Sequence, residues 1–201
     1  DKEERFPKAI LKGLAELGLM AVNVPESLGG AEAGPIAYAL AMQEVARACA
    51  STAVTMAVTN MVGEVIAAFG TDAQKNHCNP KLASGEYAAG AFALSEPEAG
   101  SDPAGMRTTA VRDGDHWIIE GQKQWITSGA HAGVMVVWAR TGDKEKLPGT
   151  RGISCFIVEK GTKGFSYGKK EDKLGIRCSE TRQLIFEDCE VPEENIVGGK
   201  E

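Results

Sequence analysis

The chain has 201 residues, of which 43% are hydrophobic and 25% are charged, and its formal net charge is −6. These values fit one large or two small globular domains, and the negative charge argues against a nucleic-acid-binding surface, which would be basic. No run of about 18 apolar residues occurs, since even the weakly polar stretch of residues 48–70 carries Glu64, so we expect no membrane span.

The first 86 residues have the apolar periodicity of helices, and four helices are expected there. They span about residues 4–17, 35–48, 51–69 and 71–80. We expect Ser51 or Thr52 to cap the third helix. Thr71 followed by Gln74 is a capping-box pattern for the fourth helix, which Pro80 should end or kink.

Beyond residue 86, short β-rich runs alternate with glycine and aspartate turns. The expected strands span residues 87–94, 108–112, 116–121, 124–127, 134–139, 153–159, 165–169 and 183–188. The run at 134–139 is continuously apolar, so this strand should be buried on both faces. The sequence therefore predicts an α+β fold, with an all-α helical domain over residues 1–86 and a barrel or sandwich over 87–201.

Five cysteines, an odd number with no CxxC pair, favour a reducing compartment over a disulfide or zinc framework. His77 and Cys78 are neighbours, but adjacent residues on a helix point about 100° apart and do not chelate together. We therefore expect no metal site. The chain also lacks the GxSxG, HExxH, P-loop and GxGxxG motifs.

Two stretches have the composition of a cofactor site. Residues 95–102 follow a strand, and Gly100 with free N–H groups near Ser101 could hold a phosphate. In residues 125–129, Trp125 offers a flat face and Thr127 a hydroxyl, which suit a flat cofactor ring. Taken singly, an ordinary strand connection and a buried tryptophan remain the plainer readings.

A third stretch, residues 175–182, places two arginines in a polar turn. Arg177 and Arg182 could meet a phosphate or a carboxylate. The plainer reading is that they pair with neighbouring acidic side chains, namely Glu171, Asp172 and Glu180.

In their order and spacing these stretches resemble the acyl-CoA dehydrogenase family, over the whole chain. The matching segments are residues 6–30 for the opening helices, 82–86 for the domain junction, 92–102 for a first signature, 121–129 for a second, and 177–179 with 181–182 for a third. The resemblance implies an N-terminal helical domain, a middle antiparallel β-barrel that binds FAD, and a C-terminal helical bundle. It also implies α,β-dehydrogenation of an acyl-CoA thioester in fatty acid metabolism, with hydride transfer to FAD and electrons passed to an electron-transfer flavoprotein.

The resemblance assigns eight residues to the cofactor site, which are Phe92, Leu94, Ser95, Gly100, Ser101, Trp125, Ile126 and Thr127. The Ser95 hydroxyl would bond to the flavin ring, and Thr127 would bond near its reactive nitrogen. Gly100 and Ser101 would meet the cofactor phosphates, and Ser101 would also contact the acyl-CoA. The resemblance also implies that the full-length protein is a homotetramer, located in the cytoplasm or, in a eukaryote, in the mitochondrial matrix.

The chain departs from the family pattern at several positions. Ser95 stands where threonine is commoner and keeps the hydroxyl, Phe92 stands where tyrosine is frequent, and Glu98 brings a negative charge to the phosphate loop. No catalytic base is assigned, because the family carries it in the C-terminal bundle, beyond residue 201. Glu96 and Asp102 are interpreted as loop-structuring residues, and this chain alone should bind flavin poorly.

Two alternatives stay open from the sequence. One is an acyl-CoA oxidase-like or flavin monooxygenase relative on the same fold. The other is a truncated, non-catalytic module that binds a CoA ester or a partner protein.

Overall fold

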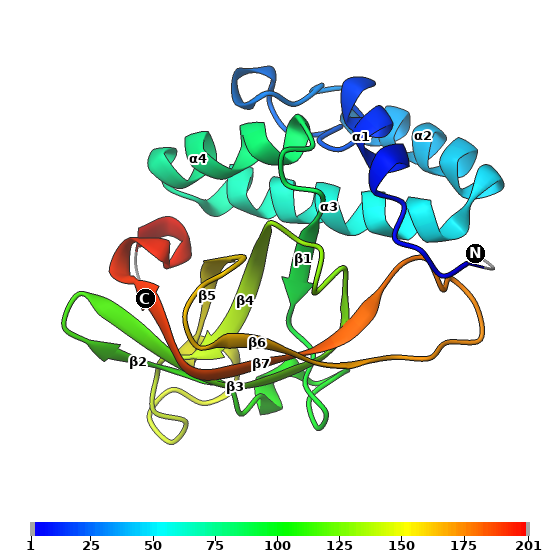
Figure 1. Cartoon of the computed structure of the whole chain (residues 1–201). Coiled ribbons are helices and arrows are strands. Elements are labelled where there is room, and N and C mark those ends of the chain that lie inside the picture. The colour runs from blue at the N-terminus through cyan, green and yellow to red at the C-terminus, as the bar shows by residue number, and fades with distance from the viewer. Residues whose placement is uncertain (1–2, 200–201) are drawn as a thin grey trace.

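A computed structural model describes residues 3–199 as a helical layer packed on a curled β-sheet (Figure 1). The helices are α1 (Lys8–Glu16), α2 (Gly34–Ala48), α3 (Ala50–Phe69) and α4 (Asp72–Ala83). In Figure 1, α3 lies between the other helices and the sheet, and it contacts α1, α2, α4 and β1 (Gly90–Ala93). The predicted combination of a helical part and a β part is confirmed.

The starts of two helices differ from the prediction. The first begins at Lys8 rather than near residue 4, because Pro7 occupies the N-cap position and a proline disfavours helical geometry in the residue before it. The third begins at Ala50, with Cys49 in extended geometry as the N-cap. Neither Ser51 nor Thr52 is therefore the cap, and both are buried within the first turn.

Helix α4 confirms one prediction and corrects another. The Gln74 N–H donates to the Thr71 hydroxyl at 3.3 Å, and the Thr71 N–H donates to the Gln74 side chain at 2.9 Å, which completes the capping box. Pro80, however, lies inside the helix, which continues to Ala83. The last turn is buried, with Leu82 fully inaccessible, so core packing holds the helix together beyond the proline.

Helix α3 bears on the expectation of no membrane span, which stays a prediction. Among the described residues, α3 is the single helix that is long and apolar enough, by length and composition alone, to cross a bilayer. Half of its apolar window is buried inside the protein. Its place between the other helices and the sheet is that of a core helix, a kind of helix that meets the same criteria.

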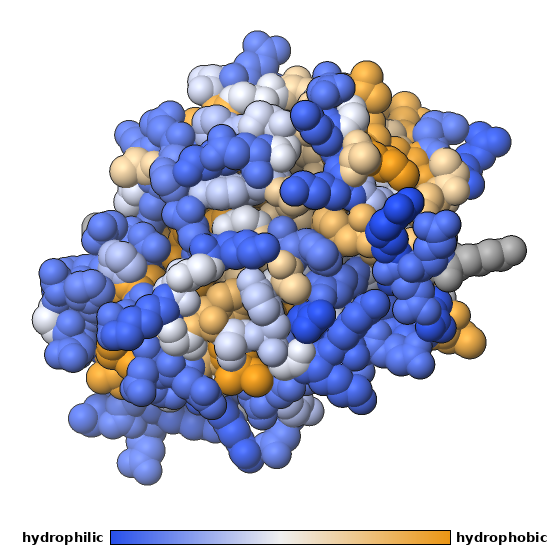
Figure 2. All heavy atoms as spheres, viewed as in Figure 1, coloured by the Kyte–Doolittle hydropathy of each residue, from blue (hydrophilic) through white to orange (hydrophobic). Residues whose placement is uncertain are grey.

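Apolar side chains also gather on the outside of the helical layer, over α1 and α2 at the upper right of Figure 2. The large exposed apolar residues of these two helices are Ile10, Ile36 and Leu40, and Ile36 is 77% exposed. A contiguous apolar surface of this kind commonly marks a contact site.

Seven strands form a single curled sheet. After β1 come β2 (Thr109–Asp113), β3 (His116–Thr127), β4 (Val134–Arg140), β5 (Ile153–Glu159), β6 (Phe165–Lys170) and β7 (Thr181–Pro192). Their order is β1-β4-β2-β3-β7-β6, and β5 pairs with the free side of β4. The sheet is mixed rather than purely antiparallel, because β1 and β2 each run parallel to β4. The chain passes through the β2–β3 hairpin between β1 and β4, and can therefore return in the same direction.

Residues 116–127 form one long strand, where the sequence predicted two. The pairing of β3 with β7 shifts register between Ile119 and Gly121, and again between Lys123 and Ile126. Gly121 has φ 140°, and a Cβ there would lie 2.6 Å from the Thr108 hydroxyl. The two β-bulges interrupt the alternation of side chains, which explains why the sequence pattern looks like a strand break.

Strand β4 is buried on both faces, as its apolar run predicts. On one side Met135 and Val137 enter the core of the curled sheet. On the other, Val134 and Val136 pack in a second cluster that includes Ile66 of α3. Strand β4 therefore joins the core of the β-sheet to the core of the helical layer.

Candidate functional site

The site begins at the C-terminal end of β1, where side chains alternate between two faces. Ala91 and Ala93 are fully buried in the sheet core, and Phe92 and Leu94 point to the opposite face and are half-buried. Phe92 contacts Trp138 of β4, with ring centroids 4.3 Å apart at 42°. Sequence reasoning did not assign Trp138 to the site, and its only signal was its place in an otherwise buried strand.

The second bulge of β3 presents Trp125 to the outside. Trp125 has φ 59° and is 58% exposed, so the reading of a buried tryptophan is wrong. Its neighbour Ile126 is 2% exposed and belongs to the sheet core, and Thr127 is half-buried. The side chains of Trp125 and Thr127, on either side of Ile126, remain available to a ligand. Ile126 itself could offer only its backbone groups.

The bulge also joins the first and second signatures. The Gln124 N–H, which leaves the β3–β7 ladder at the register shift, donates to the Ser95 carbonyl at 2.9 Å. Its side-chain amide donates to the Glu171 carboxylate at 2.6 Å. The register shift therefore brings the end of β1 and the Trp125 segment together.

A buried ion pair supports the same junction. The Glu96 carboxylate accepts hydrogen bonds from the N–H groups of Arg107 at 2.6 Å and Thr108 at 3.1 Å. It also accepts from the Lys123 ammonium at 2.8 Å, and the two side chains are 5% and 0% exposed. Burial raises the pKa of Glu96, but the hydrogen bonds it accepts outweigh burial and bring that pKa below its usual value. Glu96 thus structures the loop, as predicted.

The acidic residues farther along the loop are also engaged. Asp102 accepts a hydrogen bond from the Ala104 N–H at 3.2 Å, which supports its interpretation as a loop-structuring residue. Glu98 forms an exposed ion pair with Arg107. The charge that Glu98 brings to the loop is therefore offset by a neighbouring cation.

Several polar groups on this side have no protein partner among the described residues. They are the hydroxyls of Ser95 and Thr127, and both the hydroxyl and the N–H of Ser101. Gly100 and Ser101 are exposed on the loop. Neutral donors beside a flat indole suit a ring with polar edges, and free loop N–H groups suit a phosphate. This donor set fits a flavin dinucleotide.

The third signature supports the second from behind. Thr127 pairs with Thr181 in the β3–β7 ladder. The Ser128 N–H donates to the Glu180 carbonyl at 2.8 Å, and the Ala130 N–H donates to the Glu180 carboxylate at 2.9 Å. Ser128 has φ 61°, so this turn depends on its contacts to Glu180.

The two arginines of the third signature form ion pairs with acidic side chains. Arg182 pairs with Glu180, whose side chain is 5% exposed. Arg177 pairs with Asp172 at 3.0 Å and also with Glu4. The plainer reading is therefore confirmed for Asp172 and Glu180, and neither arginine is left to mark a phosphate site.

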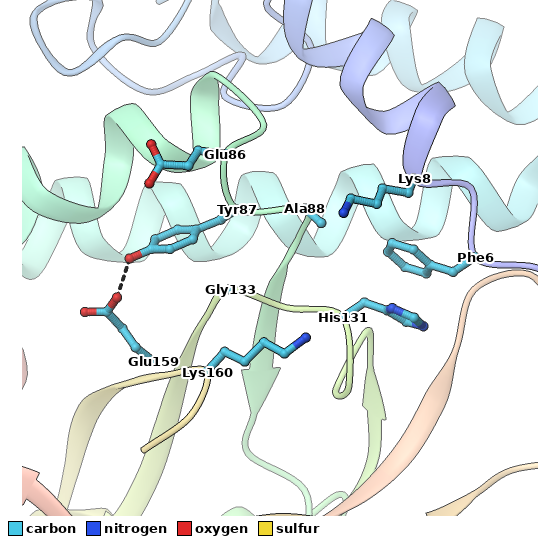
Figure 3. A pocket seen from close by; sticks show the side chains of 9 residues that line it. All are labelled: Phe6, Lys8, Glu86, Tyr87, Ala88, His131, Gly133, Glu159 and Lys160. Atoms are coloured by element: carbon cyan, nitrogen blue, oxygen red, sulfur yellow. Dashed lines mark hydrogen bonds between the residues drawn. The ribbon is translucent and has the colours of Figure 1, made fainter. Parts of the chain in front are cut away.

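A separate pocket of about 350 Å³ lies at the junction of the two layers (Figure 3). Phe6 stacks on His131 there, with ring centroids 4.0 Å apart, and the Tyr87 hydroxyl donates to Glu159. His77 contacts the other oxygen of Glu159 at 2.8 Å. None of the eight predicted cofactor residues lines this pocket.

Two family models cover nearly all of the chain. The model described as the N-terminal domain of acyl-CoA dehydrogenase matches residues 1–86, and the model described as the middle domain matches residues 91–189. The chain belongs to the acyl-CoA dehydrogenase family. The short-chain specific acyl-CoA dehydrogenase of Sus scrofa mitochondria is 48% identical over 200 residues, which are 98% of this chain and 47% of that protein.

Solved structures of relatives extend the comparison. A chain in a structure described as the electron transferring flavoprotein of Acidaminococcus fermentans has a TM-score of 0.94 and 41% identity, and covers 100% of this chain. A glutaryl-CoA dehydrogenase of Mycobacterium smegmatis, described in complex with FADH2, has a TM-score of 0.88, 34% identity and 97% coverage. A prolyl acyl carrier protein oxidase has a TM-score of 0.90, 32% identity and 98% coverage. This chain covers 52%, 48% and 52% of these three chains respectively, so it spans about half the length of its relatives.

Proposed function

We propose that the protein containing this chain oxidises a short-chain acyl-CoA thioester to the α,β-unsaturated product, with FAD as the electron acceptor. In this reaction a base takes the α proton, and the β hydrogen leaves with its electron pair as a hydride. The observation that carries the proposal is the junction between Gln124 and Ser95. Beside it, the hydroxyls of Ser95 and Thr127 have no hydrogen-bond partner among residues 3–199, and the Trp125 ring is 58% exposed. The family membership and the name of the porcine relative support the substrate class.

The chain's own residues would bind and orient the cofactor. When bound, FAD supplies a two-electron acceptor. Ser95 and Thr127 would donate hydrogen bonds to its ring from fixed positions, without adding charge. Trp125 would cover the ring edge and limit the access of water and oxygen. The N–H groups near Gly100 and Ser101 would hold phosphate, with Ser101 also reaching the CoA ester.

We place the catalytic base in the part of the relatives that this chain does not cover. The three carboxylates of the first signature are committed elsewhere, since Glu96 accepts three hydrogen bonds, Glu98 pairs with Arg107, and Asp102 holds the loop. A carboxylate whose lone pairs are taken by buried donors is a poor proton acceptor. This assignment agrees with our expectation that the chain alone binds flavin weakly.

For the electron acceptor we propose an electron-transfer flavoprotein. The proposal is supported by the structure with a TM-score of 0.94, which is described as an electron transferring flavoprotein. Direct oxidation by oxygen is the second candidate, because an oxidase shares 32% identity with the chain. Rapid hydrogen peroxide formation with an acyl-CoA, and no electron transfer to an electron-transfer flavoprotein, would favour the oxidase.

We also propose a homotetramer in a reducing compartment, either the cytoplasm or the mitochondrial matrix. The exposed apolar side chains of α1 and α2 are consistent with a subunit contact. The five free cysteines are consistent with a reducing compartment.

The cofactor site is tested with the full-length protein and two variants that remove only a hydroxyl, Ser95→Ala and Thr127→Val. Each lost hydrogen bond should weaken FAD binding roughly 2- to 10-fold and shift the visible flavin spectrum, which titration with FAD can measure. Thr150→Val, at an exposed position of the short 3-10 helix Gly149–Gly152, is the matched control. If neither variant changes affinity or spectrum, the ring lies elsewhere, and if the unaltered protein takes up no FAD, the non-catalytic alternative is favoured.

A further inference from the structure

Lys123 is an unusual residue for the middle of a β-strand, because its side chain is 0% exposed. Lysine is almost never fully buried unless its charge is paired. Here the ammonium donates to the Glu96 carboxylate at 2.8 Å and to the Leu94 carbonyl at 3.2 Å. The cation therefore contacts the backbone immediately before Ser95 as well as its acidic partner.

The ion pair joins three segments that are distant in sequence, namely residues 94–96, residues 107–108 and Lys123. Lys123 belongs to β3, Leu94 to the end of β1, and Glu96 to the loop that follows. Glu96 in turn accepts from the N–H groups of Arg107 and Thr108, just before β2. Removing the ammonium would release the end of β1 and leave the carboxylate without its cation.

Lys123 lies next to the second bulge of β3, and this bulge links Lys123 to the residues that we propose to hold the cofactor. Lys123 pairs with Leu184 in the last regular step before the register shift, and the next pair is Ile126 with Arg182. The Gln124 N–H then bonds to the Ser95 carbonyl. Two consecutive residues of β3 thus hold two consecutive carbonyls at the end of β1.

We propose that Lys123, together with Glu96, is a positioning residue that fixes the Ser95 hydroxyl and the Trp125 ring relative to each other for the flavin. This inference rests on the proposed function. Lys123 acts through the Leu94 carbonyl and the bulge, and it does not contact the cofactor itself. Buried ion pairs are often no more stabilising than a well-packed apolar pair, so geometric specification is the stronger reason for a lysine at this position.

The test uses the full-length protein with FAD and separates positioning from stability. Lys123→Met removes the ammonium and keeps an unbranched side chain of similar length. The double variant E96Q/K123M also neutralises the carboxylate that would otherwise be left unpaired. Lys144→Met, in an exposed loop, is the matched control. For each protein, the FAD dissociation constant, the visible flavin spectrum, the flavin reduction potential and the thermal midpoint are measured.

The expected results follow from the two roles of the pair. Lys123→Met should raise the FAD dissociation constant roughly 10- to 100-fold, as a displacement of about 1 Å does at a preorganised site, and should shift the flavin spectrum and potential. The double variant should regain most of the thermal midpoint without regaining affinity or spectrum. Lys144→Met should match the unaltered protein in every measurement.

Opposite results would overturn the inference. If the double variant is folded and its FAD affinity, spectrum and potential equal those of Lys144→Met, then Lys123 does not position the site, although the proposed function stands. The same comparison decides the matter if Lys123→Met fails to fold. If the unaltered protein binds no FAD, the proposed function itself fails, and the inference fails with it.

Discussion

Two polar clusters of this protein each centre on a glutamate carboxylate, but they differ in burial and in their partners. In the β-domain, Glu96 and Lys123 form a pair with side chains 5% and 0% exposed. At the junction of the layers, Glu159 accepts from the Tyr87 hydroxyl and contacts His77, with Glu159 38% and His77 50% exposed. In both clusters burial raises the pKa of the carboxyl group, and in both the hydrogen bonds bring that pKa below its usual value.

From the difference in burial we expect the two clusters to differ in how strongly they specify geometry. Water competes for the half-exposed groups at the junction, so a lost partner is replaced by solvent at little cost. No solvent reaches Lys123, so a lost partner leaves an unpaired charge in the interior. The residues that we propose to face the flavin are attached to the buried cluster of Glu96 and Lys123.

The largest effect is expected for Glu96→Ala, which leaves two N–H groups without an acceptor and the buried Lys123 ammonium without its counter-charge. The free energy of unfolding should fall by about 3–5 kcal/mol. Urea unfolding of the full-length protein, followed by circular dichroism, measures the change. A loss below about 1 kcal/mol would place the buried pair in the same class as an exposed one.

The same carboxylate predicts how stability changes with pH. The pKa of Glu96 is lower in the folded than in the unfolded chain, so its contribution is complete above the unfolded value and is lost as the pH falls through the folded value. Stability should therefore decline on acidification below the ordinary range of carboxyl groups. Glu96→Gln should flatten that decline in a series of urea titrations, and an unchanged slope would contradict the assignment.

A smaller effect concerns backbone conformation, which also distinguishes the two regions. Trp125 and Ser128 have positive φ, whereas Tyr87, His77 and Glu159 do not. Trp125→Ala and Trp125→Gly both remove the indole, but only glycine adopts this conformation freely. Trp125→Gly should therefore be more stable than Trp125→Ala by about 1 kcal/mol, offset in part by chain entropy. Equal thermal midpoints would mean that the bulge relaxes when the indole is gone.

The smallest effect is expected at the junction. Glu159→Gln keeps an acceptor for Tyr87 and removes a half-exposed charge, so the free energy of unfolding should change by about 0–1 kcal/mol. Thermal unfolding of Glu159→Gln and Glu96→Gln, measured in parallel, compares the loss of stability at the two clusters directly. A loss above about 2 kcal/mol at Glu159 would mean that burial does not separate the two clusters.

The elements that the sequence predicted well have local causes. The capping box of Thr71 and Gln74 requires only residues within one turn, and the two-sided burial of β4 follows from a continuous apolar run. The C-terminal end of helix α4 could not be predicted from local sequence, because its turn beyond Pro80 depends on the tertiary packing of Leu82. The parallel pairing of β1 with β4 likewise depends on contacts between distant segments.

The sequence predicts the candidate site as a set of residues, which stays a prediction, but it does not predict their arrangement. The resemblance supplied Ser95, Trp125 and Thr127, whereas no local pattern showed that Ile126 faces the core or that Trp125 is exposed. Lys123 was missed because a lysine in a sequence is ordinarily read as a surface residue. Its role depends on a partner 27 positions away.

The bulge between Lys123 and Ile126 has a consequence for how this region can change in evolution. Strand β3 has one residue more than β7 across this bulge, so Ile126 faces the core while the side chains of Trp125 and Thr127, which we propose to contact the cofactor, do not. Deleting Gln124 would restore a regular ladder and turn the side chains beyond it to the other face, so the indole and the isoleucine would exchange environments. Substitutions in this strand can therefore accumulate one at a time, whereas a change in its length would remove the core contact and the cofactor face together.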